Sequence, residues 1–348
     1  MANIINRVGG KLKKVTRKVQ KKFNSRGLIL MYHSIGEEAS DAWSLRVRPK
    51  HFEEHMEVFR KLGHPLSLSE LYKSIQAGEV PDRSITITFD DGYYNNLQLG
   101  KPILEKYDVP ATVFVTTSFV EHGLSYWWDE LEYALMSPGQ LPDQLTLRLN
   151  GNEHHWDLNS AATFTEEQAK KENLPRPWLG EEGTRCHFHF SVWAALQDYL
   201  PAEQRALVKQ VVDWAGIPTP ELKEPFRPMT PEELHILEKD NLVSIGAHTV
   251  HHPMLGRHSA EIQSREILQS KEYLETVLNH PVKHFAYPFG NYNDDTEGIL
   301  EKGDFDCACS TQQEAVWKKS ERYFLPRMEA TDLSGEEMEE TLETLFKC

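Results

Sequence analysis

Two adjacent carboxylates, Asp90 and Asp91, stand at the end of the apolar run 84–89 and immediately before Gly92. Neighbouring anions repel each other, so a fold keeps both only where a cation or a proton lies beside them. Gly92 permits a tight turn that brings both carboxylates to the end of a strand, although consecutive strand residues point to opposite faces. Another part of the chain must therefore supply the compensating positive charge.

A pair of histidines, His248 and His252, lies four residues apart in the stretch HTVHH. With a carboxylate oxygen, two imidazoles make a His₂-carboxylate set that leaves a fourth position open, as in catalytic zinc sites. A divalent cation held there would neutralise one aspartate. Asp90 could then stay ionised and act as the base for a water molecule activated by the metal.

Other polar residues also stand at the downstream ends of apolar runs. His33 follows LILMY, the Tyr-Pro-Phe-Gly sequence of 287–290 follows KHFA, and Arg327 follows YFLP. The C-terminal ends of strands in a parallel barrel form one rim, where the active sites of such enzymes are built. Residues far apart in the sequence would then converge on one mouth.

Each of these features also has a purely structural interpretation. Asp-Asp-Gly is a common turn, a histidine pair four apart often lies on a solvated helix face, and Tyr-Pro-Phe-Gly is itself a turn sequence. His33 could be a hydrogen-bonded core histidine. The aromatic residues 126–128 could pack the core of a subdomain, which we favour over stacking on a sugar ring. The shared position of the polar residues at strand ends favours a functional site.

The distribution of apolar residues predicts an α/β fold. Several apolar runs are continuous, which favours strands buried on both faces, and amphipathic helical patterns lie between most of them. This alternation predicts a parallel sheet closed as a barrel. The predicted strands are 27–33, 84–90, 111–116, 242–248, 283–288, 305–310 and 322–327, and the predicted helices are 51–63, 230–239, 259–279 and 334–346.

The alternation breaks in a segment rich in Trp, His and Pro, which includes a predicted hairpin around Asn150 and Gly151. We therefore divide the chain into three parts. A basic amphipathic segment covers 1–26, a barrel covers 27–122 and 229–348, and an inserted aromatic-rich subdomain covers 123–228.

The net charge, the length of the apolar runs and the cysteine spacing limit the classes of partner and the expected location. The formal net charge is −15, so nucleic acid is not expected to bind the main body. No apolar run reaches the length of a membrane span. The four cysteines, Cys186, Cys307, Cys309 and Cys348, have no metal-binding or disulfide-framework spacing, which favours a reduced, cytoplasmic location.

The first 26 residues contain nine Lys or Arg and no acid, with apolar residues at helical spacing. They lack the continuous apolar core of a secretory signal. One interpretation is peripheral contact with an anionic membrane at its inner face, and another is a basic arm that is solvated or docked on an acidic domain.

Three motifs in this order carry a resemblance to a known family: TFDDG (88–92), HTVHH (248–252) and FAYPFG (285–290). Together they resemble the signature of the polysaccharide deacetylase family, the metal-dependent carbohydrate esterases of NodB-homology type. LMYHSI (30–35) and LPRM (325–328) resemble flanking motifs of its subgroup with an N-terminal histidine strand. The resemblance spans about 27 to 330 and implies a distorted (β/α)₇ barrel.

The resemblance also implies roles for individual residues. Asp90 corresponds to the catalytic base, and Asp91, His248 and His252 correspond to the metal ligands. The backbone N–H of Tyr93 corresponds to a donor for the oxyanion.

The sequence departs from the family pattern in two places. Ala286 stands where classic members carry an arginine, and Arg327 is the residue that could replace its guanidinium beside Asp90. The late catalytic histidine is not evident, and in the resembling subgroup the acid role passes to the early histidine, here His33.

These residues predict a hydrolase, most simply zinc-dependent, that removes acetyl from the nitrogen of an N-acetylated sugar. Its substrate could be a polysaccharide or a lipid-linked or nucleotide-linked glycan, and the oligomeric state is open. One alternative is a carbohydrate-binding relic without activity. Another is Mg²⁺-dependent phosphoryl transfer, although no glycine-rich phosphate loop is evident and histidine suits zinc better.

Overall fold

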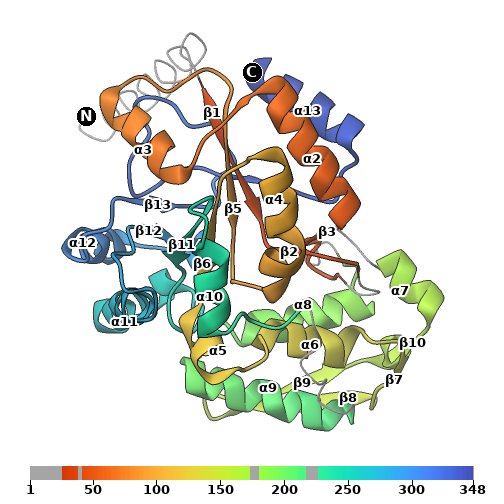
Figure 1. Cartoon of the computed structure of the whole chain (residues 1–348). Helices are drawn as coiled ribbons and strands as arrows, with labels where there is room; N and C mark the ends of the chain where they lie inside the picture. Colours follow the sequence, from red (N-terminus) through yellow and green to blue (C-terminus); the bar gives the residue numbers. More distant parts are fainter. Residues whose placement is uncertain (1–25, 38–40, 173–179, 217–225, 348) are drawn as a thin grey trace, which may run out of the picture.

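One parallel sheet forms the centre of the molecule (Figure 1). The computed structural model describes residues 26–37, 41–172, 180–216 and 226–347. The strand order is β13-β12-β11-β6-β5-β1-β14, with β4 paired to β5, and the expected α/β fold with a curled parallel sheet is confirmed. The strands are β1 (Gly27–Tyr32), β4 (His64–Pro65), β5 (Ser84–Phe89), β6 (Ala111–Val115), β11 (Val243–Ala247), β12 (His284–Ala286), β13 (Cys307–Cys309) and β14 (Met328–Glu329).

The segment 322–329 bridges the two edges of this sheet. The N–H of Ala308 donates to Arg322 O at 2.8 Å on the β13 side, and β14 pairs with β1 on the other side. The predicted strand at 322–327 is wrong, because the regular strand begins only at Met328. Pro326 has no N–H to give to a ladder, which accounts for the irregular backbone before β14.

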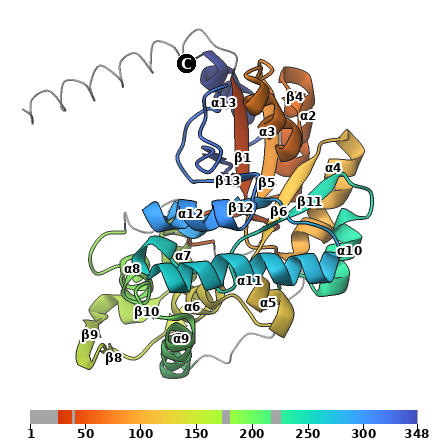
Figure 2. The same cartoon turned by 90° about the vertical axis from the view of Figure 1, so that its left-hand side faces the viewer.

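Helices cover the outside of the sheet, and Figure 2 shows α11 and α12 side by side there. A capping box formed by Thr230 and Glu233 opens α10, which corresponds to the helix predicted at 230–239. The helices of the barrel are α2 (Pro49–Leu62), α3 (Leu68–Ala77), η1 (Asn96–Gly100), α4 (Lys101–Tyr107), α5 (Thr117–His122), α10 (Pro231–Glu238), η4 (Leu255–Arg257), α11 (Ala260–Leu278), η5 (Pro288–Gly290), α12 (Asp294–Lys302) and α13 (Gly335–Lys347).

Residues of one strand divide between two apolar clusters, as the alternation of a strand requires. Leu28 and Leu30 of β1 pack with Phe52 of α2, whereas Ile29 belongs to the cluster that contains Phe114 and Cys307. All six residues of β1 are buried, so the continuous apolar run reports burial on both faces.

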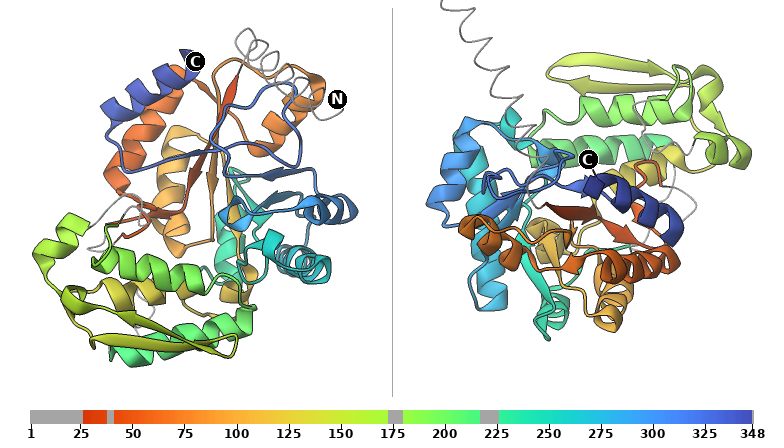
Figure 3. Two further views of the ribbon diagram at one scale, coloured as in Figure 1. Left: turned by 180° about the vertical axis from the view of Figure 1, so that it is seen from behind. Right: turned by 90° about the horizontal axis from the view of Figure 1, so that it is seen from above.

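A second group of elements lies beyond the C-terminal ends of β1 and β5 (Figure 1), and both views of Figure 3 show its yellow and green ribbon gathered at one end. It has its own aromatic core, which includes Tyr126 and Trp127. The hairpin predicted around Asn150 and Gly151 is present as β8 and β9. Its elements are α6 (Trp127–Met136), β7 (Gly139–Gln140), β8 (Gln144–Leu149), β9 (Asn152–Asp157), η2 (Asn159–Ala162), β10 (Thr163–Phe164), α7 (Glu166–Glu172), α8 (Arg185–Ala195) and α9 (Pro201–Ala215).

A short parallel pair, β2 (Ser34–Ile35) and β3 (Arg46–Val47), follows β1. The loop between these two strands carries Trp43 and approaches the inserted elements, because the N–H of Ala42 donates to Glu132 Oε1 of α6 at 3.2 Å.

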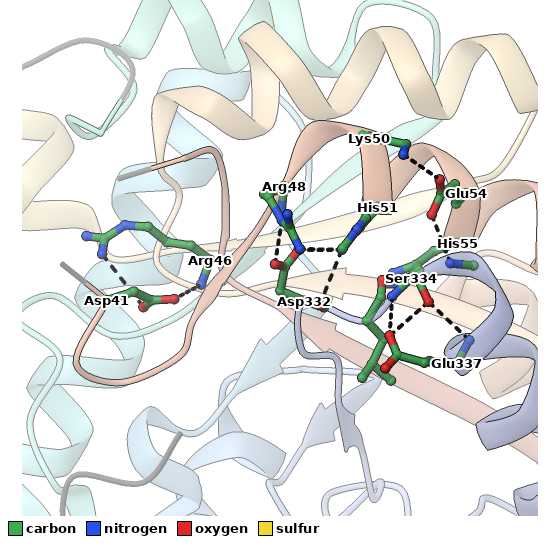
Figure 4. Close-up of polar contacts among 12 residues, drawn as sticks. Asp41, Arg46, Arg48, Lys50, His51, Glu54, His55, Asp332, Ser334 and Glu337 are labelled. Carbon is green, nitrogen blue, oxygen red and sulfur yellow. Dashed lines mark hydrogen bonds and ion pairs between the residues drawn. The ribbon is translucent and has the colours of Figure 1, made fainter. Parts of the chain in front are cut away.

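Polar contacts attach the segment after β14 to α2 (Figure 4). Arg48 Nε donates to Asp332 Oδ2 at 2.7 Å, and the N–H of Gly335 donates to Glu54 Oε2 at 2.9 Å. His55 Nε2 lies 2.7 Å from Leu333 O. These contacts fix the chain that leads from Arg327 to α13.

The basic segment predicted at 1–26 lies outside the described residues except for Arg26, so its membrane contact stays a prediction. Within the described parts, no helix is both long enough and apolar enough to cross a bilayer.

Candidate active site at the C-terminal ends of the strands

The side chains predicted to bind a metal lie together. One ligand atom from each of Asp91, His248 and His252 falls within 4.8 Å of the others. Asp91 Oδ1 lies 3.7 Å from His248 Nε2 and 3.4 Å from His252 Nε2. Asp91 follows β5 and His248 follows β11, so the rim of a parallel sheet brings the two segments together as expected.

The backbone at these ligands adopts unusual conformations. The φ angles of Asp91 and His252 are 73° and 63°, a region that residues with a Cβ rarely occupy. Gly92 follows with φ 88°, and a Cβ there would meet Val115 Cγ2 at 3.2 Å. Such conformations persist only where surrounding structure holds them, and they concentrate at functional sites.

Buried Glu266 of α11 holds the loop between the two histidines. Its Oε2 accepts the N–H groups of Val250 and His251 at 3.0 and 2.8 Å, and its Oε1 lies 2.7 Å from His251 Nδ1. His251 therefore turns toward α11 rather than toward the ligand set. Thr249 Oγ1 accepts the N–H of His252 at 2.9 Å, which completes the turn.

The arrangement of these donor atoms fits a cation. Asp91 Oδ1 is buried and has no hydrogen-bond partner among the described residues, although two imidazole nitrogens face it. Burial, and then the Asp90 charge, raise the pKa of Asp91 well above its usual value. Burial lowers the pKa of both histidines, so each offers a neutral nitrogen. A bound divalent cation would keep Asp91 ionised and complete this set.

The two histidines are held in different ways. His248 Nδ1 lies 2.8 Å from Ala286 O, which fixes the ring with Nε2 toward Asp91. His252 Nδ1 has no hydrogen-bond partner among the described residues. Instead, the His252 ring lies between Trp128 and Phe289, with ring centroids 4.6 and 4.5 Å away.

Asp90 has a different partner. Arg327 Nη1 donates to Asp90 Oδ1 at 2.6 Å and Nη2 donates to Oδ2 at 2.8 Å. Arg327 is itself held by Ser310 O, which accepts from Nε at 3.0 Å. Burial alone would raise the pKa of Asp90, but Arg327, and then His248, hold this pKa well below its usual value. Asp90 is therefore ionised without help from a metal.

Arg327 thus supplies a guanidinium next to Asp90 although Ala286 occupies the family's arginine position. The absence of the family's arginine would by itself favour an inactive relic. With Arg327 in contact with the carboxylate, this argument loses its force.

His33 lines the same cavity as the two aspartates. Burial lowers its pKa to about 4, although the Asp90 charge opposes this shift. The ring is therefore neutral in the free site. A role as acid requires that His33 receive a proton during the reaction.

Tyr93 is turned away from the cavity. Its hydroxyl donates to Asp129 Oδ2 at 2.9 Å and accepts from Trp128 Nε1 at 2.9 Å, so the side chain belongs to the inserted elements. The backbone N–H of Tyr93 donates no hydrogen bond to the described part of the chain. Tyr93 is also the residue that directly follows the Asp-Asp-Gly turn.

A cavity of about 350 Å³ contains these groups. Sequence reasoning missed much of its lining, namely Met31, Trp43, Leu45, Phe190, Trp193, Met254, Thr311, Gln313 and Glu329. Of these, Thr311 gave a usable signal, because it is a polar residue that directly follows the predicted strand 305–310. Trp128 both lines the cavity and packs the inserted core, so the packing interpretation of residues 126–128 describes only part of its surroundings.

Comparison with known proteins gives one consistent answer. The model of a family described as polysaccharide deacetylase matches residues 77–174 and 197–308, more than half of the chain. The protein YxkH of Bacillus subtilis (strain 168), whose name refers to the same family, is 23% identical over 302 residues, which cover 86% of this chain and 70% of that protein. A Staphylococcus aureus poly-β-1,6-N-acetyl-D-glucosamine N-deacetylase is 22% identical over 267 residues, which cover 77% of this chain and 61% of the relative.

A solved structure shares the fold. The Streptococcus pyogenes deacetylase PplD, in complex with acetate, superposes with a TM-score of 0.54 at 22% identity, over 92% of this chain and 99% of that one.

Proposed function

The chain belongs to the polysaccharide deacetylase family, and from this we propose that it is a metal-dependent hydrolase that removes the acetyl group from the nitrogen of an N-acetylated sugar. One observation carries the proposal: an Asp-His-His donor set lies beside a separate carboxylate, Asp90, that Arg327 keeps ionised. Such a pair provides one place for a cation and one group for accepting a proton.

Asp91, His248 and His252 would hold the cation, and two imidazoles with one carboxylate favour zinc over magnesium. When bound, the cation supplies Lewis-acid activation of water and of the carbonyl oxygen. The neutral state of both histidines and the unpaired Asp91 Oδ1 support this assignment.

The remaining residues would handle the protons. Asp90 takes a proton from the attacking water, whose oxygen bonds to the amide carbon. The N–H of Tyr93 is the proposed donor to the oxyanion that forms. The C–N bond then breaks, acetate leaves, and His33 gives a proton to the nitrogen that stays on the sugar. Because the pKa of His33 is about 4 in the free site, this proton must reach it within the cycle.

The substrate class is an N-acetylated glycan. The similarity to a poly-β-1,6-N-acetyl-D-glucosamine N-deacetylase supports β-1,6-linked N-acetylglucosamine as a first candidate. Lipid-linked and nucleotide-linked N-acetyl sugars complete the set to be tested.

The test is metal-dependent acetate release by the purified full chain. The chain is freed of metal, reloaded with Zn²⁺ and supplied with β-1,6-linked, lipid-linked and nucleotide-linked N-acetyl sugars. We expect release from at least one class, and an Asp90→Asn variant that keeps its metal but loses about 10²–10⁴-fold in kcat. An Asp90→Asn variant with unchanged turnover would contradict the base assignment. Metal-loaded wild-type protein that releases no acetate from any of them would favour the inactive relic.

A further inference from the structure

Building on the proposed function, we infer that an aromatic wall limits the site to a terminal N-acetylated sugar residue, or to one carried singly, and excludes residues inside a long polymer. We define the aromatic wall as Trp43, Phe190 and Trp193, three side chains that line the cavity. This inference concerns substrate class and adds no step to the chemistry.

The aromatic wall comes from segments outside the family match. That match covers 77–174 and 197–308, so it begins after Trp43 and omits 175–196. Phe190 and Trp193 lie on α8 (Arg185–Ala195), inside the omitted stretch. The catalytic groups Asp90, Asp91, His248 and His252 all lie inside the match. The family match therefore covers Asp90 and the three proposed metal ligands but none of the three aromatic side chains.

The three rings form a continuous surface. The ring centroids of Trp43 and Trp193 lie 4.7 Å apart, and those of Phe190 and Trp193 lie 5.9 Å apart. Trp193 also contacts Phe289 at 5.5 Å, and Phe289 contacts the ligand His252 at 4.5 Å. Only one ring therefore separates the aromatic wall from the proposed metal ligands.

Polar side chains also line the cavity. They are His33, Thr311 and Gln313, from the segments after β1 and β13, and Glu329 at the end of β14. A pyranose ring has an apolar C–H face and a rim of hydroxyl groups, so it matches a cavity lined by both aromatic and polar side chains. A sugar whose acetamido group reaches the metal ligands would meet the aromatic wall at once.

The size of the cavity supports a single residue. Its volume is about 350 Å³. Ligand sites range over roughly 300–1,000 Å³, so this cavity lies near the lower end. That space suits one N-acetylated hexose better than several residues of a chain.

The aromatic wall is also firmly held. Trp193 is 9% exposed, and its ring stacks on that of Trp127 in the inserted core, with the ring centroids 6.5 Å apart. The loop that carries Trp43 is fixed by Asp41, whose carboxylate accepts the N–H groups of Leu45 and Arg46 at 2.9 and 3.1 Å. The aromatic wall is therefore a fixed surface beside the proposed metal ligands.

The first experiment locates the deacetylated residue. Zn²⁺-loaded wild-type protein is given the methyl glycoside of N-acetylglucosamine and its β-1,6-linked oligomers of two, four and six residues, and products are sequenced by mass spectrometry. We expect acetate from one terminal residue and a rate per chain that does not rise with length. Removal from internal residues at rates within a few-fold of the terminal one would overturn the inference.

The second experiment measures binding and does not depend on turnover. Metal-loaded Asp90→Asn protein is titrated with the same ligands, and binding is measured by ligand-observed NMR. Adding Trp193→Ala should weaken binding of the methyl glycoside at least about tenfold, so that the six-residue oligomer becomes the tighter ligand. Adding Trp193→Phe should largely preserve the parent protein's preference for the methyl glycoside over the oligomer. Trp214→Phe, which alters an indole that bonds to Gln144 O outside the cavity, is the matched control.

The two proposals can fail separately. If wild type releases no acetate but Trp193→Ala reverses the binding preference, the reaction is wrong and the role of the aromatic wall stands. If a folded Trp193→Ala protein binds the methyl glycoside as tightly as its parent, or if no N-acetyl sugar binds the parent at millimolar concentration, the role of the aromatic wall is overturned.

Discussion

Arg327 and Asp90 form a buried, two-pronged ion pair, with N–O distances of 2.6 and 2.8 Å. Arg327 is fully buried and reaches Asp90 from the segment just before β14, 237 residues away along the chain. The two adjacent aspartates thus have different environments. One carboxylate is neutralised by an arginine of the chain itself, and the other faces two imidazoles across a space suited to a cation.

Replacing Arg327 should change the pH dependence of activity. Arg327→Met removes the charge that holds the pKa of Asp90 down, so this pKa should rise and the base should ionise only at higher pH. We expect the acidic limb of kcat/KM to move upward by at least one pH unit, with Arg327→Lys intermediate. The measurement is a pH profile of acetate release with metal content recorded for each protein. A profile that coincides with that of wild type would show that Arg327 does not set the ionisation of Asp90.

Replacing His33 should affect substrates according to their leaving group. His33→Gln should lower kcat for an N-acetyl sugar by about 10²–10⁴-fold, because the departing amine needs a proton. Hydrolysis of 4-nitrophenyl acetate should fall much less, because nitrophenolate leaves without one. Equal losses on both substrates would assign His33 a role in binding or folding.

Replacing Trp128, which is not itself a proposed ligand, should weaken metal binding. Trp128 packs against His252, which has no hydrogen bond on Nδ1 among the described residues, and its Nε1 donates to Tyr93. Trp128→Leu should weaken Zn²⁺ binding about 10–100-fold and alter the visible spectrum of the Co²⁺-loaded protein. Trp214→Leu, which removes another indole that packs on the inserted core and bonds to Gln144 O, is the control for loss of core volume. Equal metal affinity in Trp128→Leu and wild type would remove Trp128 from the metal site.

Part of this site could be predicted from residue types alone. Asp90, Asp91 and His248 directly follow apolar runs, and the geometry of a parallel sheet makes the ends of such runs meet. Arg327 was instead expected beside Asp90 on the family resemblance, because Ala286 occupies the position of the family's arginine. Neither inference requires knowledge of side-chain packing.

The aromatic wall could not be predicted in the same way. Phe190 and Trp193 lie in the run HFHFSVW, which is apolar on several helix faces and equally consistent with core packing. Which of its rings reaches the cavity depends on how α8 rests above the strands, a long-range relationship with no local signal. The last strand was predicted at 322–327, but it begins at Met328. The apolar pattern of 322–327 does not reveal that Pro326 lacks the N–H that a regular strand there would need.

Acid sensitivity should depend in part on His189. This histidine is buried on α8, neither ring nitrogen has a hydrogen-bond partner among the described residues, and burial lowers its pKa to about 4. The unfolded chain, with an ordinary pKa near 6.5, binds more protons between these values, so stability falls as pH decreases from about 6.5 to 4. Between pH 7 and pH 5, protonation of this histidine in the unfolded chain should lower the free energy of unfolding by about 2 kcal/mol.

His189→Leu should remove that cost. Urea unfolding at pH 7 and pH 5 should show a smaller difference in the free energy of unfolding for His189→Leu than for wild type. His155→Gln, which changes an exposed histidine of β9, should behave like wild type. A pH dependence unchanged in His189→Leu would show that His189 does not titrate in this range.

The most direct test is a titration of the metal-free chain with Zn²⁺, in which bound metal and acetate release are measured on the same samples. We predict one ion per chain, release that rises in proportion to occupancy up to one equivalent, and loss of both in His248→Ala and Asp91→Ala. Acetate release that persists after complete removal of metal, or tight binding of one ion by His248→Ala and Asp91→Ala alike, would contradict a catalytic cation held by Asp91, His248 and His252.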